Sequence, residues 1–509
     1  MVWPGWSAGM ADEFEVQDEK KDNQFRQARL EKLDALKALG VEPYPHRFAR
    51  NAMAAELEQK HAGLAPGELT EERVTIAGRI RANRNSGMFI DLHDASGKIQ
   101  IFSHKDFLDE QGLAVVKLLD LGDQIGVEGI IRRTPRGELT VNAAKVTVLA
   151  KALLPLPEKF HGLTDVETRY RQRYLDLIMN PESRDRLRKR SKIIAAIRKF
   201  LNEQNYLEVE TPMLHSIAGG ASAKPFITHH NALDIQLHLR IAPELHLKRL
   251  IAGGLADKVF EINRCFRNEG LSPRHNPEFT SIELYEAFAD YQDMIYLAEA
   301  LVSIAAIAAV GETRVQFGGN TIDLTPPWPR KSMAGLVLEK TGIDFLAIKT
   351  APEALAAARS RGIEIAPDAL WGHALEAVFA HEVEAELIQP VHIIDFPRDI
   401  SPLAKSHRNG DPRLVERFET YMNGWEIANA FSELTNPLDQ RDRFEAQMRE
   451  RERGDEEAQM LDEDFVTALE YGMPPTGGLG IGIDRLVMIL TDSPTIRDVI
   501  AFPTMRPKG

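Results

Sequence analysis

The chain has 509 residues, of which 43% are hydrophobic and 27% are charged, and its formal net charge is −14. This composition is that of a soluble globular protein, and the length exceeds what one hydrophobic core supports, so we expect two to four domains. The negative charge argues against a nonspecific nucleic-acid binder, which usually carries a basic surface, but leaves room for a specific RNA partner.

Signals for export and for membrane insertion are not found in the sequence. Residues 1–22 contain no basic segment followed by an apolar run, so they do not resemble a signal peptide. The longest apolar stretch, Leu297 to Val310, is too short to span a bilayer, and no membrane partner is expected. Cys265 is the single cysteine, which excludes an intramolecular disulfide framework and fits a reducing cytoplasm.

Residues 1–70 are predicted to form an N-terminal helical segment. Within it, Asn23 to Gly40 has the pattern of an amphipathic helix, with leucines at every third position on one stripe and a glycine at its end.

Residues 71–150 have the pattern of a small β-barrel. Five short runs of alternating hydrophobicity are separated by turn signals; the runs are 74–80, 89–92, 98–102, 124–130 and 138–141. Five strands in so short a segment favour an oligonucleotide-binding fold (OB-fold). Phe89 is then a candidate for stacking on a base, with Arg84 and Gln100 as polar contacts. The pattern leaves RNA binding and ordinary packing of these side chains equally open.

The remaining chain is predicted to be a linker, 151–180, followed by a larger domain, 181–509. A helix begins near Asn180, and its basic residues between Arg186 and Lys192 are interpreted as a solvated face. A helical insertion is expected at about 331–385, where an Ala-rich helical period replaces the strand pattern. The stretch from Phe200 to Pro212 is a helix end followed by a strand. It is either a dimer-forming element or an ordinary junction, and the residues alone favour the junction.

A strand pair between Val259 and Tyr285 sorts its residues into two faces. Side chains alternate along a strand. One set is apolar: Phe260, Ile262, Phe266, Ile282 and Leu284. The other set is charged, polar or aromatic: Glu261, Asn263, Cys265, Arg267, Phe279, Ser281, Glu283 and Tyr285. The connecting segment, 268–277, is rich in groups that contact phosphate. The pair therefore predicts a nucleotide site built on a sheet rather than a solvated hairpin.

A glycine-rich loop is predicted between Gly477 and Arg485, just before an apolar helix. Glycines let the backbone approach a ligand closely, and a helix start favours anions. Arg485 would then face a phosphate or stack on a base.

A second hairpin is predicted around Asn423-Gly424, a strong two-residue turn signal. This turn pairs Tyr421 with Glu426 and Glu419 with Ala428, so the two glutamates become diagonal neighbours on one face. Two carboxylates at that distance need a bridging cation, for which Mg²⁺ with a triphosphate is the natural candidate.

Strict alternation along the second arm of this hairpin raises a difficulty. It puts Asn429, Phe431 and Glu433 on the face opposite to Glu426. All of them serve one site only if a bulge lies near Ala428.

Several motifs resemble the class II aminoacyl-tRNA synthetases. Phe266-Arg267-Asn268-Glu269 resembles their motif two, the segment from Gly480 to Arg485 their motif three, and the segment from Phe200 to Pro212 their motif one. Longer matches are similar to the lysyl-tRNA synthetase family; they are 154–163, 169–176, 240–245, 429–434 and 502–507. The resemblance runs from about Arg26 to the C-terminus.

The resemblance implies an α+β protein. An N-terminal OB-fold β-barrel would bind the anticodon, and a class II catalytic domain, an antiparallel sheet flanked by helices, would activate L-lysine with ATP and Mg²⁺. The implied partners are tRNA(Lys) and a second copy of the chain in a cytoplasmic homodimer.

The resemblance also assigns roles to residues. Arg267 and Arg485 would be catalytic, Arg267 at the α-phosphate and the substrate carboxylate, and Arg485 at adenine and the γ-phosphate. ATP would be bound by Arg267, Glu269, His275, Asn276, Phe279 and Arg485. Lysine would be bound by Gly220, Glu244, Arg267, Glu283, Tyr285, Asn429 and Glu433. The metal would be held by Glu419 and Glu426, and the anticodon by Arg84, Phe89, Gln100 and Glu138.

The implied reaction requires no nucleophilic side chain, because the lysine carboxylate attacks the α-phosphorus of ATP and the adenylate then acylates a ribose hydroxyl of tRNA. Catalysis would rest on positioning and charge stabilisation by Arg267, Arg485 and Mg²⁺. A buried ammonium must be paired, and Glu283 and Glu433 provide carboxylates. The ligand face of the second arm contains no Lys or Arg, which argues against an aspartate-specific enzyme, since that enzyme would need a cation there.

Two departures and two alternatives accompany the resemblance. Thr435-Asn436 stands where the family usually has Asn-Asp, beyond the ligands, and the first barrel hairpin near Arg84 is shorter than in many relatives. One alternative is a synthetase-like paralogue that ligates lysine to a protein; the other binds RNA without charging it. Every expected charged position is filled, and protein-ligase relatives lack the barrel that is expected here.

Overall fold

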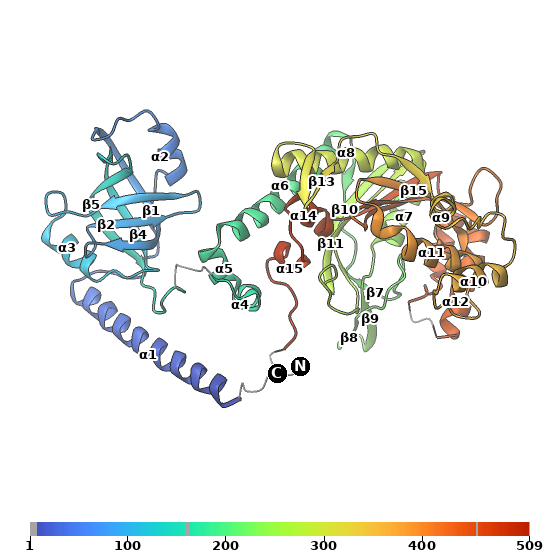
Figure 1. Ribbon diagram of the computed structural model, residues 1–509, viewed down its shortest axis with the longest axis horizontal. Helices are drawn as coiled ribbons and strands as arrows, with labels where there is room; N and C mark the ends of the chain where they lie inside the picture. Colours follow the sequence, from blue (N-terminus) through green and yellow to red (C-terminus); the bar gives the residue numbers. More distant parts are fainter. Residues whose placement is uncertain (1–7, 158–162, 455–456, 508–509) are drawn as a thin grey trace. The chain divides into compact units, whose positions relative to one another are not determined.

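The computed structural model describes residues 8–157, 163–454 and 457–507. Residues 1–7 of the predicted N-terminal segment, and 158–162 of the motif 154–163, lie outside the described residues. The chain forms two compact units, residues 1–162 and 163–509 (Figure 1).

The first unit is a closed five-stranded barrel of order β1-β2-β3-β5-β4. Its strands are β1 (Leu69–Arg84), β2 (Phe89–His93), β3 (Lys98–Phe102), β4 (Gln124–Arg133) and β5 (Leu139–Ala150), and its helices are α1 (Ala8–Ala38), α2 (Ala54–Lys60) and α3 (Glu110–Lys117). Alternate residues such as Ile90, Leu92, Ile99 and Ile101 fill the barrel interior. The predicted OB-fold strands are confirmed, although four of them are longer than predicted, and α1 begins well before Asn23.

The second unit is built on an eight-stranded sheet of order β14-β15-β16-β17-β18-β11-β10-β6. Its strands are β6 (Leu207–Glu208), β10 (Lys258–Phe266), β11 (Glu278–Ala287), β14 (Arg330–Ser332), β15 (Val391–Pro397), β16 (Leu414–Met422), β17 (Trp425–Ser432) and β18 (Thr476–Gly482). Neighbouring strands pair antiparallel except β14–β15 and β10–β6. The predicted α+β class is confirmed.

Helices and two small sheets surround this sheet. The helices are α4 (Val166–Arg171), α5 (Arg173–Met179), α6 (Pro181–Glu203), α7 (Glu244–Ala252), α8 (Tyr291–Val310), α9 (Met333–Thr341), α10 (Ala351–Ser360), α11 (Trp371–Glu382), α12 (Pro437–Glu452), α13 (Glu463–Glu470), α14 (Ile483–Leu490) and α15 (Ile496–Val499), with 3-10 turns η1 (Glu384–Glu386) and η2 (Arg398–Ile400). The small sheets contain β7 (Leu214–His215), β8 (Ile227–His230) and β9 (Ile235–Leu239), and β12 (Arg314–Phe317) with β13 (Asn320–Asp323).

The main core lies on one face of the large sheet, under α6, α8 and α14 (Figure 1). Phe260, Ile282 and Leu284, from the predicted apolar face of the first hairpin, are fully buried in it. The opposite face of the same strands points away from this core, and Val259 and Tyr285 pack there in a smaller cluster with α7. Cys265 pairs with Phe279 there, and Glu261 pairs with Glu283.

Helix α8 is long and apolar enough, by length and composition alone, to cross a membrane. It is longer than the apolar stretch predicted from the sequence. Half of it is buried inside the protein, where it packs against α6, β17 and β18. Asp290 caps its first turn, and Gly311, in the left-handed conformation, ends it. The helix is thus accounted for as a core element.

The glycine-rich stretch predicted as a loop is instead strand β18, between β11 and β17. The prediction was wrong because glycine usually weakens a strand. Here the missing side chains leave room on the face opposite the core. An added Cβ on Gly478 would fall 2.0 Å from Glu433 Oε1 and 2.7 Å from the Tyr285 ring.

A bulge corrects the predicted register of the second hairpin. Tyr421 pairs with Glu426 as predicted, but Glu419 pairs with Asn429 rather than with Ala428. Ile427 is the extra residue, because the register shifts by one between Thr420 and Tyr421. After this residue the alternation changes phase, so Glu426, Asn429 and Phe431 share a face with Glu419.

The basic stretch of α6 is not wholly a solvated face. Arg190 forms an ion pair with Asp484 and donates a hydrogen bond to Thr280 Oγ1 at 2.9 Å. It lies one turn before the buried Ile193 and therefore points toward the sheet rather than to solvent. The stretch predicted as a linker also contains structure: α5 begins at Arg173, which is buried and donates to the carbonyl of Ala501 at 2.9 Å.

Candidate active site

A cavity of ≈ 670 Å³ opens on the face of the large sheet opposite the core. This size is typical of small-molecule sites. Every residue predicted to bind ATP, lysine or the metal lines the cavity; they are Gly220, Glu244, Arg267, Glu269, His275, Asn276, Phe279, Glu283, Tyr285, Glu419, Glu426, Asn429, Glu433 and Arg485. Glu261 and Asn263 share the predicted polar face but do not line the cavity, since Arg240 covers Glu261 at 2.6 Å.

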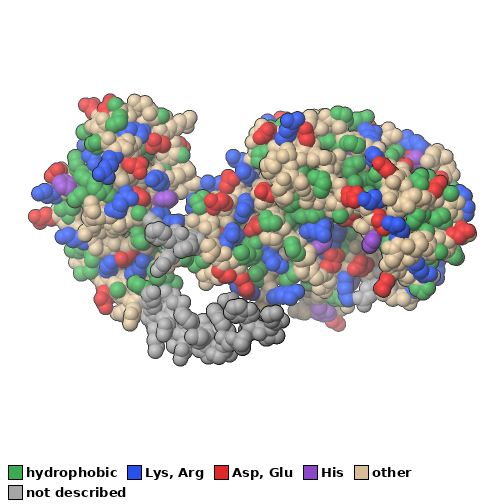
Figure 2. Space-filling view, viewed as in Figure 1, with side chains coloured by type: hydrophobic (Ala, Val, Ile, Leu, Met, Phe, Trp, Pro, Cys, Tyr) green, Lys and Arg blue, Asp and Glu red, His purple; other side chains and the backbone are tan. Residues whose placement is uncertain are grey.

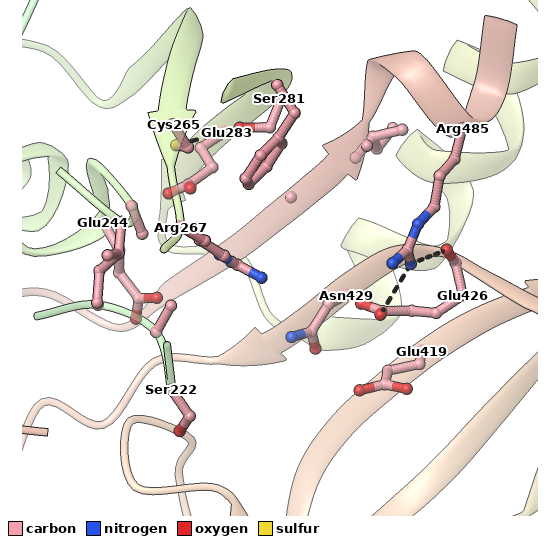
Figure 3. A pocket seen from close by; sticks show the side chains of 18 of the residues that line it. Ser222, Glu244, Cys265, Arg267, Ser281, Glu283, Glu419, Glu426, Asn429 and Arg485 are labelled. Carbon is pink, nitrogen blue, oxygen red and sulfur yellow. Dashed lines mark hydrogen bonds and ion pairs between the residues drawn. The ribbon is translucent and has the colours of Figure 1, made fainter. Parts of the chain in front are cut away.

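The cavity has two chemically different ends (Figure 3). Glu244 and Glu283 lie at one end, and Glu419 and Glu426 lie at the other beside Arg485. The Arg267 side chain extends into the space between the two ends. Its guanidinium lies 5.1 Å from the centroid of the Phe279 ring, and its Nε has no hydrogen-bond partner among the described residues. Arg267 is thus positioned to bind an anionic group.

Buried carboxylates dominate the first end. Glu244 and Glu433 are 7% and 1% exposed, and Glu283 accepts a hydrogen bond from the Tyr285 hydroxyl at 3.2 Å. Burial raises the pKa of Glu283 to about 8, and the nearby charge of Glu244 adds to the rise. Burial also raises the pKa of Glu433. Such a cluster is stable as ions only when cations pair with it.

One such cation belongs to the chain and was not predicted. Lys248 is fully buried, with its Nζ 2.5 Å from Glu244 Oε1 and ion-paired with Glu433 Oε2. The sequence does contain a signal for part of this contact, since Glu244 and Lys248 are four residues apart on α7.

Gly220 and Asn276 are held in place by the backbone and by hydrogen bonds. Gly220 has a φ of +88°, and an added Cβ there would lie 3.1 Å from Glu244 Cβ. Asn276 is 7% exposed; its Nδ2 donates to the carbonyl of Glu278 at 2.6 Å and its Oδ1 accepts from the amide of Thr504 at 3.3 Å. Both positions therefore have a defined shape before any ligand binds.

Arg485 contacts both Glu426 and His275 at the second end. Its Nη1 donates to the carbonyl of Glu426 at 2.8 Å and lies 3.3 Å from the Glu426 carboxylate. Its Nη2 lies 3.2 Å from His275 Nε2. Burial lowers the pKa of His275, with a further contribution from Arg485, so the imidazole is neutral and accepts this hydrogen bond.

Glu419 and Glu426 form a carboxylate pair, each with an arginine beside it. Glu419 Oε1 lies 2.5 Å from Arg417 Nη2, and its Oε2 accepts from the Tyr421 hydroxyl at 2.8 Å. Even so, burial and then the Glu426 charge raise the pKa of Glu419 to about 7. No cluster of three or more His, Cys, Asp or Glu side chains suited to a metal occurs among the described residues. Two carboxylates fit a Mg²⁺ ion that takes its other oxygens from phosphates and water.

Arg417 is a second residue of the site that was not predicted from the sequence. Its Nε donates to Asn429 Oδ1 at 3.0 Å, while Nη2 pairs with Glu419. It therefore ties a predicted lysine-binding side chain to a predicted metal-binding one. Alternation along β16 places Arg417 on the same face as Glu419, which was the available signal.

The four residues predicted at the anticodon share one face of the barrel unit. Arg84 pairs with Phe89 across β1 and β2, and Phe89 pairs with Phe102 across β2 and β3. Gln100 lies two residues before Phe102 and accepts a hydrogen bond from Thr140 at 3.0 Å. Glu138, just before β5, lies 3.3 Å from Lys98. The alternating buried residues point inward, so this face is the outer one.

Replacing Gly478 by alanine is expected to destabilise the protein by about 1–3 kcal/mol, because the new Cβ would overlap the Glu433 carboxylate. Gly480→Ala on the same strand is a matched control for stability, since its Cβ would meet the nearest atom at 3.7 Å. Denaturant unfolding of both variants measures the difference. Equal stabilities would show that the Glu433 side chain moves away at no cost.

Comparisons with known proteins agree with this geometry. Residues 165–506 match the family described as tRNA synthetases class II (D, K and N), and residues 74–149 match the OB-fold nucleic acid binding domain. The lysine--tRNA ligase of Rhizobium meliloti (strain 1021) is 56% identical over 483 residues, 95% of this chain and 97% of the relative. The lysine--tRNA ligase of Nostoc sp. (strain PCC 7120) is 53% identical over 499 residues, 96% of this chain and 89% of the relative.

Proposed function

The chain belongs to the class II tRNA synthetases for aspartate, lysine and asparagine, and from this premise we propose that it activates L-lysine with ATP and transfers it to the 3′ end of tRNA(Lys). The observation that carries the choice of lysine is the cluster of carboxylates at one end of the cavity: Glu244 and Glu433, which are buried, and Glu283, which is partly buried. An aspartate or asparagine side chain brings no cation to pair with them. Relatives at 52–56% identity over nearly the whole chain are lysine--tRNA ligases.

The two ends of the cavity divide the substrates between them. Glu283, Tyr285 and Glu433 surround the ε-ammonium of lysine, and Gly220 and Glu244 bind its α-amino group. Asn429 and Arg267 bind its carboxylate. The unpartnered Nε of Arg267 and the position of this side chain between the two ends support its assignment to the carboxylate and the α-phosphate together.

ATP occupies the other end. Phe279 and Arg485 enclose adenine, Arg485 and His275 reach the outer phosphates, and Glu269 and Asn276 hold the nucleotide. The lysine carboxylate attacks the α-phosphorus and pyrophosphate leaves; the ribose hydroxyl of tRNA then takes the lysyl group and AMP leaves. Arg267 lowers the barrier by stabilising charge that develops on the α-phosphate. The protein positions the reactants and supplies no nucleophile.

Amino-acid-dependent ATP–pyrophosphate exchange without tRNA tests this function. The purified chain is expected to exchange with lysine, and not with aspartate or asparagine. Exchange with aspartate alone would contradict the pocket assignment but keep the family. Exchange with lysine but no aminoacylation of tRNA(Lys) would favour a paralogue that ligates lysine to a protein.

Mg²⁺ held by Glu419 and Glu426 would neutralise triphosphate charge, which Arg485 cannot do alone. Chelation of Mg²⁺ is expected to lower exchange by about a hundredfold, and Mg²⁺ should restore it.

Glu419→Gln should raise the Mg²⁺ concentration at half-maximal rate by about tenfold. Glu416→Gln is the control, since Glu416 pairs with Arg408 away from the cavity. An unchanged requirement in Glu419→Gln would place the metal elsewhere.

Lysine binding is expected to strengthen with pH up to about pH 8. The pKa of Glu283 is raised to about 8, so its carboxyl is protonated in the free protein at neutral pH. Pairing with the ε-ammonium needs the ionised form, so binding releases a proton. The KM for lysine should therefore fall about tenfold per pH unit below pH 8, while the KM for ATP changes little. A flat profile for lysine would remove Glu283 as the ammonium's partner.

The barrel unit binds the anticodon of tRNA(Lys) through its outer face. Phe89 stacks on a base, while Arg84, Gln100 and Glu138 supply polar contacts. The exposed position of Arg84, which pairs with Asp91 at 2.7 Å, supports a role in polar contacts at the surface. The visible surface in Figure 2 has basic side chains interspersed with acidic ones, which favours a specific rather than a nonspecific RNA contact.

The functional unit is a cytoplasmic homodimer. The edge strand β6 and the small sheet of β7, β8 and β9 carry large exposed apolar side chains, a feature of interaction surfaces; they are Leu207, Met213, Leu214, Ile227, Leu233 and Ile235. This surface adjoins the segment that resembles motif one. Sedimentation equilibrium measures the state of association directly, and a monomer would contradict the proposal. The cytoplasm is consistent with Cys265, which is free and buried.

A further inference from the structure

The cavity's carboxylates are held by an ammonium that is not part of the cavity surface. Lys248 lies behind Glu244 and Glu433 and does not line the cavity, and its side chain is fully buried. The rings of Phe431 and Phe465 lie 5.2 Å and 5.9 Å from its Nζ. Its two ionic partners are carboxylates that do line the cavity. A buried ammonium at this position must therefore act on the ligand through those carboxylates.

The contacts leave part of the carboxylate surface for a ligand. Lys248 binds Oε1 of Glu244 and Oε2 of Glu433. Glu433 Oε1 has no hydrogen-bond partner among the described residues. It faces β18 at Gly478, which also lines the cavity. One oxygen of Glu433 is thus fixed by the chain, and the other is buried without a hydrogen-bond partner among the described residues, so a donor that reaches it would satisfy it.

The charges at this end balance when lysine is added. Glu244, Glu283 and Glu433 contribute three negative charges when ionised, and Lys248 neutralises one of them. The α- and ε-ammonium groups of lysine neutralise the other two. Neighbouring ions do not alter the balance, because Arg240 pairs with Glu261 and Arg417 pairs with Glu419. Arg267 is matched by the substrate carboxylate.

We propose that Lys248 is a positioning residue that determines specificity for lysine: it holds Glu244 and Glu433 in place and leaves a charge deficit that two substrate ammonium groups fill. The proposal rests on the proposed function of this site. Its physical basis is that carboxylates as buried as Glu244 and Glu433 are costly to leave ionised without a partner. An amino acid with one ammonium group leaves one carboxyl group at this end without an ionic partner, and the pocket binds it weakly.

The test is a double-mutant cycle of Lys248→Met and Glu433→Gln, measured by lysine-dependent ATP–pyrophosphate exchange in the full-length chain. Lys248→Met leaves one negative charge too many, and Glu433→Gln leaves Lys248 facing the ε-ammonium with one partner fewer. Each single variant is expected to lose about a hundredfold in kcat/KM for lysine, with the KM for ATP nearly unchanged. The double variant restores the balance and should be about tenfold better than either single variant.

A packing role for Lys248 predicts the opposite order, with the double variant worse than both single ones, and that result would overturn the proposal. An unchanged KM for lysine in Lys248→Met would also overturn it. If Lys248→Met does not fold, the double variant decides, because removing both members of a buried ion pair is tolerated far better than removing one. Failure of both to fold would assign Lys248 to the core alone.

Arg249→Met provides the matched control. Arg249 is the next residue on α7, and it pairs with Asp462 at 2.7 Å and with Asp464, neither of which lines the cavity. Its removal should leave kcat/KM for lysine within about twofold. The wild-type chain separates the two hypotheses. No exchange with lysine by the wild-type chain would refute the proposed function. Exchange by the wild-type chain, together with additive losses in the two single variants and the double variant, would refute only the role of Lys248.

Discussion

Replacing Arg267 by alanine is expected to abolish lysine activation, lowering kcat/KM in ATP–pyrophosphate exchange by about a thousandfold or more. The side chain extends between the two ends of the cavity, where the lysine carboxylate and the α-phosphate must meet. Its guanidinium stacks on Phe279, and its Nε has no partner among the described residues, so its hydrogen-bonding capacity is kept for the ligands. The loss should appear mainly in kcat, because the charge that Arg267 stabilises develops on the α-phosphate in the transition state.

Arg264→Ala is the control for this substitution. Arg264 lies three residues earlier, on β10, which ends just before Arg267; its side chain is 43% exposed, and it pairs with Glu278 at 3.5 Å. Its removal should change exchange by less than about twofold. A loss of less than tenfold in Arg267→Ala would mean that another cation holds the α-phosphate.

Replacing Glu283 by glutamine is expected to lower kcat/KM for lysine by about 100- to 1000-fold while the KM for ATP stays within threefold. An amide cannot neutralise a buried ammonium. Glu278→Gln is the control and should leave both constants unchanged, because Glu278 is half-exposed and lies five residues earlier on the opposite face of β11. Equal losses for lysine and ATP in Glu283→Gln would mean that Glu283 supports the fold instead of the pocket.

The same substitution should not destabilise the free protein. The pKa of Glu283 is raised from its ordinary value of 4.5 to about 8. A raised acid pKa means that ionisation opposes folding, so this carboxyl costs stability increasingly as the pH rises from 4.5 to about 8. Glutamine has no such cost. The stability of Glu283→Gln relative to the wild type should therefore increase across this pH range, which thermal unfolding measures.

The two-faced hairpin could be predicted from the sequence because each face is uniform over several residues. Alternation in β10 and β11 separates Phe260 and Ile282 from Cys265 and Glu283, and the structure keeps this separation. The resemblance then located the residues of the cavity, since short motifs such as Phe266 to Glu269 are tied to specific positions in the fold. Local pattern and motif were sufficient for these features.

Lys248 could not be predicted, because its burial depends on a distant part of the chain. The helix α7 is short, and a lysine four residues after a glutamate is usually a surface pair. Glu433 follows the end of β17 and comes to Lys248 only when α7 packs on β10 and β11, and no local pattern reports that contact. Arg190 was misread for the same reason: its partners, Asp484 and Thr280, come from separate elements.

The sequence predicts a loop where strand β18 forms, because glycine has a low strand propensity but the pocket needs residues without side chains at these positions. Glycines weaken an isolated strand, but between β11 and β17 this strand receives hydrogen bonds from both sides. Its glycines make room for Glu433 and Tyr285, so the strand is conformationally costly but necessary for the shape of the pocket.

The single extra residue at Ile427 makes the length of β17 as important as its composition. Deleting it would restore regular alternation, and Glu426 would then point away from the face that carries Asn429 and Phe431. Tolerance to insertions and deletions should therefore be lowest in this short segment, even though conservative side-chain changes at Ile427 keep the count. In a lineage of such proteins, the spacing between Glu426 and Glu433 should change less readily than the residues that fill it.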